Sequence, residues 1–144
     1  MKSSRVRAIL PLLIFLLLGG VRADAVAQRL IVHPDIDLAE VRADAVRAMF
    51  MMRLRKWPDG TPVRVFVLSD TDPVHRIFAK RIVGVLPYQL RRAWDRGVFA
   101  GTSQAPIEVT SESEMLDRVA TTPGAVGYVS DQMGDKRVRF IPVE

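Results

Sequence analysis

The pattern of apolar and polar residues divides the chain into short segments. Some are continuous apolar runs of the length of a β-strand, and others have apolar residues at the spacing of one helix face. Residues 29–33 form an apolar run that a proline ends, and residues 62–68 form a second run rich in β-branched side chains. Runs of this length, bounded by Pro, Gly and polar residues, are typical of β-strands. Further short runs of the same kind predict strands at residues 107–109, 125–129 and 137–141.

Between the predicted strands, apolar residues recur at intervals of three and four, which is the spacing of one helix face. The first such segment predicts a single helix over residues 38–52, capped by Asp35 or Asp37. The apolar face of this predicted helix holds Leu38, Val41, Ala45, Met49 and Met52.

Three further helices are predicted from their start signals. Pro73 and Pro87 each suit the first position of a helix, because proline lacks an N–H and has a helical φ. Ser111, with Glu114 three residues later, forms a capping box before an apolar segment. Strands and helices alternate, so the predicted fold class is α/β, a sheet flanked by helices in two or three layers. In the helix that begins at Pro87, the same spacing predicts that Leu90, Trp94 and Val98 face the core and that Arg91, Arg92 and Arg96 face the solvent.

The first 27 residues have the three parts of a secretory signal. Basic residues precede an apolar run over residues 8–18, and Ala25-Val26-Ala27 fits the small-x-small cleavage rule. The alternative is an uncleaved membrane anchor, but about eleven apolar residues fall short of the ~20 that span a bilayer. We therefore expect a signal peptide over residues 1–27 and a periplasmic, soluble single domain over residues 28–144.

Removal of this segment changes what the charge implies. The whole chain has a formal net charge of +5, whereas residues 28–144 carry 17 basic and 15 acidic residues, a net charge of +2. This balance, without aromatic residues interleaved among the basic ones, argues against nucleic-acid binding. The chain has no cysteine and only two histidines, so thiol catalysis and a recognisable zinc site are excluded and no cofactor is predicted.

The most suggestive chemistry lies where the second strand gives way to a helix, at residues 69–76. A helix that starts directly after a strand directs unpaired N–H groups and a partial positive charge toward this point. Two hydroxyls and a nearby arginine could add to an oxyanion site there, although helix capping explains the same residues without any ligand. The candidate ligand-binding residues are Ser69, Asp70, Thr71 and Arg76.

Hydrolysis is a weaker possibility at the same place. Ser69, Asp70 and His75 supply the residue types of a catalytic triad within seven positions. Triad members normally come from separate loops, and no Gly-x-Ser-x-Gly motif is present. We therefore expect a protein that is not an enzyme.

The order of motifs between residues 49 and 129 resembles that of the periplasmic phosphate-binding proteins, the substrate-binding subunits of phosphate ABC transporters. The segment 122–129, TPGAVGYV, is similar to the Pro-Gly-Ala-Ile-Gly-Tyr signature of this family. The other matching pieces are Trp57-Pro58-Asp59-Gly60, Ser69-x-Thr71, Phe78, Trp94, Phe99-x-Gly101 and Pro106.

The resemblance implies one lobe of a type II periplasmic-binding-protein fold. It also implies phosphate held by the hydroxyls and main-chain N–H groups of a Ser-Gly-Thr loop, helped by an upstream arginine. Ser69 and Thr71 match the hydroxyl positions, Asp70 replaces the glycine, and Arg64 lies one residue out of register. The other lobe of the family is not encoded between residues 28 and 144.

Together these observations predict an exported, non-enzymatic relative of the phosphate-binding proteins. Its expected ligand is phosphate or another oxyanion, and its expected partners are a membrane transporter or a second protein lobe. The alternative is an interaction module that kept the fold and lost the ligand site. In that case the face that met the second lobe would bind a protein partner.

Overall fold

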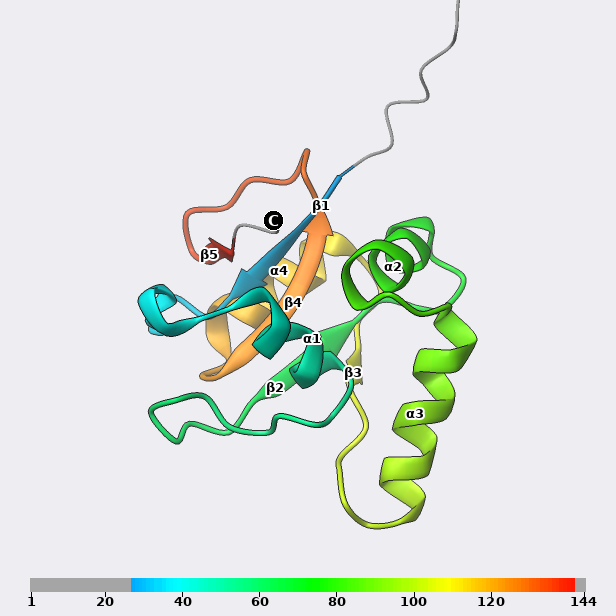
Figure 1. Ribbon diagram of the computed structural model, residues 1–144. Helices are drawn as coiled ribbons and strands as arrows, with labels where there is room; N and C mark the ends of the chain where they lie inside the picture. Colours follow the sequence, from blue (N-terminus) through cyan, green and yellow to red (C-terminus); the bar gives the residue numbers. More distant parts are fainter. Residues whose placement is uncertain (1–26, 142–144) are drawn as a thin grey trace, which may run out of the picture.

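The computed structural model describes residues 27–141, which form a mixed five-stranded sheet in the order β3-β2-β4-β1-β5 (Figure 1). β2 runs parallel to both β3 and β4, whereas β1 runs antiparallel to both β4 and β5. The predicted α/β class is therefore confirmed. The strands are β1 (Gln28–Val32), β2 (Arg64–Val67), β3 (Ile107–Glu108), β4 (Ala125–Ser130) and β5 (Arg139–Ile141).

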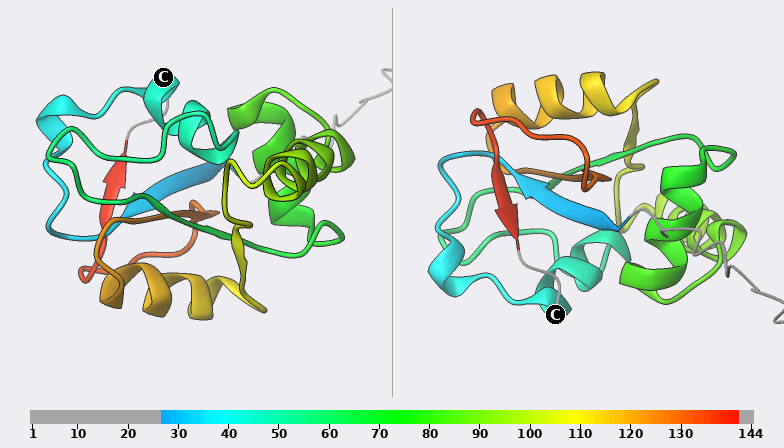
Figure 2. Two further views of the ribbon diagram at one scale, coloured as in Figure 1. Left: turned by 90° about the horizontal axis from the view of Figure 1, so that it is seen from below. Right: turned by 90° about the horizontal axis from the view of Figure 1, so that it is seen from above.

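Helices cover both faces of this sheet, so the molecule has three layers. Figure 2 shows α4 on one face and α1 on the other, with α2 and α3 together at one end. The helical elements are η1 (Leu38–Glu40, a 3-10 helix), α1 (Ala43–Phe50), α2 (Pro73–Phe78), η2 (Ala79–Val83, a π-helix that continues α2), α3 (Pro87–Phe99) and α4 (Glu112–Thr121).

The core is built around β4, whose six residues are all buried. Successive side chains of a strand point to opposite faces of the sheet, and β4 contacts a different helical layer on each face. The backbone of Gly127 faces Met115 and Val119 of α4. On the other face, the ring of Tyr128 stacks on that of Phe78 with the centroids 3.7 Å apart. β4 therefore joins the two helical layers.

The prediction of one helix over residues 38–52 is wrong. Val41 and Arg42 have extended backbone conformations, so the segment divides into η1 and the shorter α1. Asp37 caps η1 by accepting from the N–H of Ala39. α1 ends before Met52, whose φ of +60° is left-handed and turns the chain away from the helix axis. The apolar residues keep the spacing of one helix across this break. The spacing depends only on where the apolar side chains occur, so it does not reveal a change in the backbone between them.

The inward face predicted for α3 is only partly correct. Leu90 and Trp94 are buried, and the indole N–H of Trp94 donates to the carbonyl of Phe50. Val98, one turn further on, is 44% exposed because α3 extends beyond the helices and the sheet that it packs against (Figure 1).

The predicted signal peptide lies almost entirely in residues 1–26, outside the described residues. Within residues 27–141 no helix is both long enough and apolar enough to cross a membrane.

Candidate functional site

The candidate site lies at the carboxyl end of β2, where the chain turns directly into α2. Leu68 is buried in the core, Ser69 is half-buried, and Thr71 is exposed. Asp72 caps the helix, with its carboxylate accepting from the N–H of Val74 at 2.8 Å, and Pro73 takes the first helical position. The predicted passage from strand through a hydroxyl-bearing turn to a helix start is confirmed.

The two predicted hydroxyls are held together within this turn. The Oγ of Ser69 and the Oγ1 of Thr71 lie 3.1 Å apart, and the N–H of Thr71 points at the Ser69 Oγ at 3.4 Å. The N–H of Asp72 donates to the carbonyl of Ser69 at 2.9 Å, which closes the turn. The turn therefore presents two adjacent hydroxyls in a fixed arrangement at the surface.

Asp70 does not stand as a free carboxylate in this turn, because Arg91 of α3 holds it with two hydrogen bonds. The Nε of Arg91 lies 3.0 Å from one carboxylate oxygen, and Nη2 lies 2.9 Å from the other. Nη2 also reaches Glu108 of β3 at 3.4 Å. A bidentate arginine–carboxylate pair is strong for a surface pair, and it offsets the negative charge that Asp70 would otherwise direct at an anion.

Arg91 does not lie on the solvated face of its helix, where the apolar spacing predicted it. Its side chain is only partly exposed, and the pKa of its guanidinium is raised, first by the hydrogen bond to Asp70. The two partners lie 21 positions apart in the sequence. No local spacing joins them, so only the packing of α3 beside the turn reveals the pair.

His75 of α2 is completely buried behind Asp70, on the helix face that it shares with Phe78, Ala79 and Ile82. This spacing of three and four is the signal in the sequence that could have indicated the burial of His75. Its Nδ1 forms a hydrogen bond with the hydroxyl of Tyr128. That hydroxyl also accepts from the N–H of Leu68 at 2.9 Å, and the Nε2 of the same imidazole faces the Asp70 carboxylate, which can only accept. Nδ1 is therefore an acceptor, and the proton of the neutral ring lies on Nε2.

The Nε2 of His75 points toward the same carboxylate that Arg91 holds. It lies 3.5 Å from an Asp70 oxygen and has no hydrogen-bond partner among the described residues. Burial lowers the pKa of His75, and the neighbouring Asp70 opposes this shift only in part. Burial also raises the pKa of the Tyr128 hydroxyl. Both rings are therefore neutral at neutral pH, and His75 lies on the core side of Asp70.

This arrangement does not assemble a hydrolytic triad. Among the hydrogen bonds of residues 27–141, none joins the Ser69 hydroxyl to His75. The imidazole faces Asp70 on one side and Tyr128 on the other, so it is not positioned to take a proton from serine. Nor does this part of the chain bring together three His, Asp or Glu side chains that could hold a metal ion.

The remaining two arginines considered from the sequence lie elsewhere. Arg76 is exposed on α2, and no hydrogen bond or ion pair within residues 27–141 connects its side chain to the turn. Arg64 begins β2, five residues before Ser69. At about 3.3 Å per residue of strand, that places it roughly 16 Å away, at the opposite end of β2. The structure thus joins Ser69, Asp70 and Thr71 with Arg91 rather than with Arg64 or Arg76.

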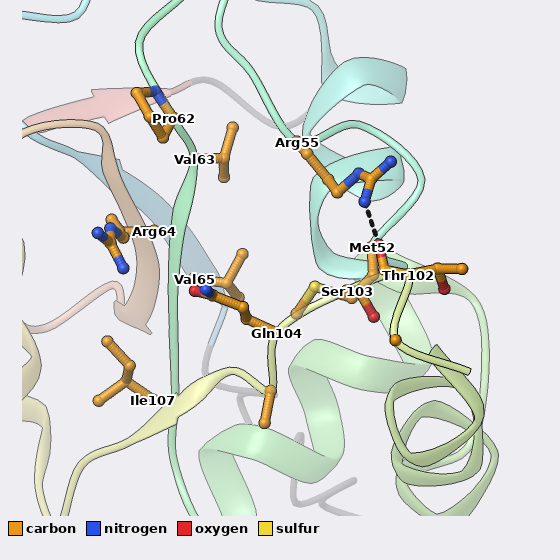
Figure 3. Close-up of a pocket in the computed structure, with 12 residues that line it drawn as sticks. Met52, Arg55, Pro62, Val63, Arg64, Val65, Thr102, Ser103, Gln104 and Ile107 are labelled. Atoms are coloured by element: carbon orange, nitrogen blue, oxygen red, sulfur yellow. Dashed lines mark hydrogen bonds between the residues drawn. The ribbon is translucent and has the colours of Figure 1, made fainter. Parts of the chain in front are cut away.

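A cavity of about 420 Å³ lies beside the amino-terminal half of β2, away from the turn (Figure 3). Val63 and Val65 of the β2 segment form one wall, and residues 101–105 form another. Arg55 crosses this space and donates to the carbonyl of Thr102, whereas Arg64 points to the other side of the strand (Figure 3). Because the two guanidinium groups diverge, this cavity does not gather positive charge as an anion site would.

Comparisons of the fold with solved structures identify phosphate-transport proteins. An ABC-type phosphate transport receptor from Vibrio cholerae matches with a TM-score of 0.57 at 16% identity, over 79% of this chain and 44% of that one. PstS from Borrelia burgdorferi matches with a TM-score of 0.60 at 13% identity, over 80% of this chain and 46% of that one.

A third similar structure, from Clostridium perfringens, is described as a putative phosphate ABC transporter substrate-binding protein with bound phosphate. It matches with a TM-score of 0.63 at 16% identity, over 79% of this chain and 43% of that one. This chain therefore has the fold of part of these proteins and spans less than half of their length. No protein-family model matches the sequence, and no curated protein matches it.

Proposed function

We propose that this chain is an exported, non-enzymatic binding protein that takes phosphate or another oxyanion at the turn between β2 and α2. The observation that carries the proposal is the pair of hydroxyls, Ser69 and Thr71, 3.1 Å apart at a helix start and beside a charge-compensated Asp70. The similar structures are binding proteins for phosphate transport, which supports the same class of ligand.

The two hydroxyls supply the hydrogen-bond donors of the proposed site. Each can rotate its proton away from the other and toward an anion, so the contact between them is exchanged for two contacts with the ligand. The start of α2 adds little to this set, because Pro73 has no N–H and the N–H of Val74 already donates to Asp72. Arg76 is the remaining member of the proposed set, an exposed cation on α2 whose positive charge would attract the anion.

Asp70 gives the proposed site a preference among oxyanions. Arg91 offsets the charge of Asp70, but the remaining lone pairs of the carboxylate can only accept hydrogen bonds. An anion that carries a proton can therefore bond to Asp70, whereas an anion without a proton cannot. Phosphate is protonated at neutral pH and sulfate is not. The proposed site therefore binds phosphate more tightly than sulfate.

A site with one wall binds weakly, because water remains in contact with the ligand and each hydrogen bond contributes only about 1 kcal/mol. The turn is open to solvent at Thr71. A second protein lobe or a membrane transporter would supply the missing wall. In this proposal the chain acts outside the cytoplasm, as the signal-like residues 1–27 predict.

The proposal is tested by the thermal stability of the purified protein in phosphate, sulfate and chloride at equal ionic strength. A ligand at 100 times its dissociation constant stabilises the folded state by about 2.7 kcal/mol. We expect stabilisation by phosphate that exceeds the effect of sulfate. We expect Ser69→Ala/Thr71→Ala to abolish it.

The matched control is Thr102→Ala/Thr121→Ala, which removes two hydroxyls from exposed residues. Thr102 lines the cavity beside the amino-terminal half of β2, and Thr121 is the last residue of α4. This variant should keep the full response to phosphate. Equal stabilisation of both double variants would show that phosphate acts elsewhere, and no stabilisation of the wild type would reject the proposed function.

A second candidate function is an interaction module that no longer binds an oxyanion. It is favoured by one observation, that the chain spans less than half the length of the structures it resembles. The surface around the turn would then contact a protein. This candidate predicts no response to any oxyanion, together with loss of a protein partner on Thr71→Arg.

A further inference from the structure

The exposed apolar side chains of the described residues are concentrated at one end of the molecule. Leu86, Tyr88, Val98 and Phe99 are the large apolar residues that remain exposed there, and all of them belong to α3 or its cap. Phe99 is 96% exposed. An aromatic ring left almost entirely in water is unfavourable by the area it fails to bury. The position of these four residues on one helix therefore calls for an explanation.

The same part of the chain carries an excess of positive charge. Between residues 73 and 100 there are six basic residues and one acidic residue, Asp95. The remainder of residues 28–144 carries 11 basic and 14 acidic residues. Arg91 is paired with Asp70, which leaves five exposed cations on α2, η2 and α3: Arg76, Lys80, Arg81, Arg92 and Arg96.

Helix geometry arranges the outward residues of α3 in one stripe. At 3.6 residues per turn, positions 88, 92, 96 and 99 lie within about 80° of one another. Tyr88 and Phe99 therefore mark the two ends of the stripe, with Arg92 and Arg96 between them. The guanidinium of Arg92 lies over the ring of Tyr88, 5.7 Å from its centroid. Asp95 lies in the same stripe and reduces its charge without cancelling it.

The opposite side of α3 is the side that packs against the molecule. Leu90 and Trp94 are buried there, so the stripe faces away from the rest of the molecule. η2 lies beside α3 at the same end of the molecule (Figure 2). It carries the cations Lys80 and Arg81.

From these observations we propose that α3 and η2 form a docking surface for an anionic phospholipid membrane. Clusters of four to eight basic residues on an amphipathic helix bind anionic headgroups, and tyrosine is favoured at the headgroup level. Phe99 enters the boundary of the acyl chains, and Arg92 and Arg96 pair with phosphates. A membrane fits better than a protein partner because the stripe is a projecting ridge, whereas protein interfaces centre on a packed and enclosed core.

The test uses the full chain carrying Phe99→Trp, with vesicles of phosphatidylcholine alone or of phosphatidylcholine with phosphatidylglycerol. Trp57 and Trp94 are buried, so a change on mixing reports the new indole at position 99. We expect its emission to shift to the blue with anionic vesicles only, and less so at high salt. Because the readout is local to α3, membrane attachment through another segment does not imitate it.

The contribution of the stripe's charge is measured with Arg92→Gln/Arg96→Gln in the same Phe99→Trp background. At roughly 1 kcal/mol for each basic residue, partitioning into anionic vesicles should fall about 30-fold. The matched control, Arg42→Gln/Lys136→Gln, removes the same net charge from exposed residues before α1 and between β4 and β5, and it should retain binding.

Three results would overturn the proposal. The first is no blue shift with anionic vesicles, and the second is an equal loss of binding in both double variants. The third is a Phe99→Ser variant that changes the oligomeric state of the protein in solution, which would make the stripe a protein interface. None of these results depends on the response to phosphate, so the two proposals fail separately.

Discussion

Gly124 lies directly before β4, where three other groups converge on its backbone. Its carbonyl accepts from the indole N–H of Trp57 at 2.9 Å and from the N–H of Arg64 at 3.0 Å. Its φ of +75° is left-handed, and a Cβ at this position would collide with the carbonyl oxygen of Pro62. This glycine therefore allows β2, β4 and the turn at Trp57 to approach one another.

We predict that Gly124→Ala lowers the free energy of unfolding by at least about 2 kcal/mol, because it adds both backbone strain and a collision with Pro62. Urea denaturation measures the change. Gly134→Ala is the control, since a Cβ there meets nothing within 4 Å and the φ of Gly134 is not left-handed. Similar stability of the two variants would contradict this account of Gly124.

His75 makes the stability of the fold depend on pH. Burial places its pKa in the folded state below the ordinary value of 6.5, so the unfolded chain takes up a proton first as the pH falls. The stabilisation of the folded state by neutral His75 is therefore fully present above about pH 6.5. It is lost progressively as the pH falls from there toward the lower pKa of the folded state.

We predict that His75→Gln reduces the loss of stability below about pH 6.5, because an amide oxygen can still accept from the Tyr128 hydroxyl and does not titrate. Chemical denaturation at a series of pH values gives the comparison. The difference in the free energy of unfolding between the wild type and His75→Gln should be constant above about pH 7 and should become smaller at acid pH. A difference that stays constant throughout would show that His75 does not titrate on unfolding.

At the scale of the element, α2 depends on its cap more than a longer helix would. It has six residues before it continues as η2, and the Asp72 carboxylate satisfies its Val74 N–H. The same residue closes the turn that holds Ser69, through its own N–H. The cap therefore positions the proposed oxyanion site as well as the helix.

We predict that Asp72→Ala lowers the free energy of unfolding by about 1 kcal/mol, the usual cost of losing a capping side chain. Thermal unfolding followed by circular dichroism is a suitable measurement. Asp95→Ala, on the exposed face of α3, should change stability by less than about 0.5 kcal/mol. An equal effect of the two substitutions would argue against the capping role of Asp72.

The elements differ in how well the sequence predicts them. The start of α2 is predicted correctly because Asp72 and Pro73 act on their own neighbours. The break between η1 and α1 is not predicted, because the apolar residues on either side of the extended Val41 and Arg42 keep the spacing of one helix. The ion pair between Asp70 and Arg91 also escapes prediction, because it exists only after α3 has packed beside the turn.

For the whole molecule, the alternation of strand-like and helix-like segments in the sequence predicts the α/β class but does not predict the order of the strands in the sheet. The resemblance to the phosphate-binding proteins goes further, because it implies a particular fold, and the similarity to solved structures supports that fold. Motifs such as the one at residues 122–129 carry this information because they mark tight approaches between distant segments. The burial of His75 is indicated only by its spacing from Phe78 and Ile82, and a histidine at such a position does not by itself show what its ring contacts.

The position of β1 in the sheet has a consequence for biosynthesis. β1 is the first strand of the described chain, yet its neighbours are the last two: Leu30 is opposite both Tyr128 of β4 and Ile141 of β5. A growing polypeptide therefore offers β1 no partner until both of these late strands have left the ribosome. Such distant pairing slows folding, so β1 stays unpaired, and accessible to chaperones or a translocation channel, until residues 125–141 have been synthesised.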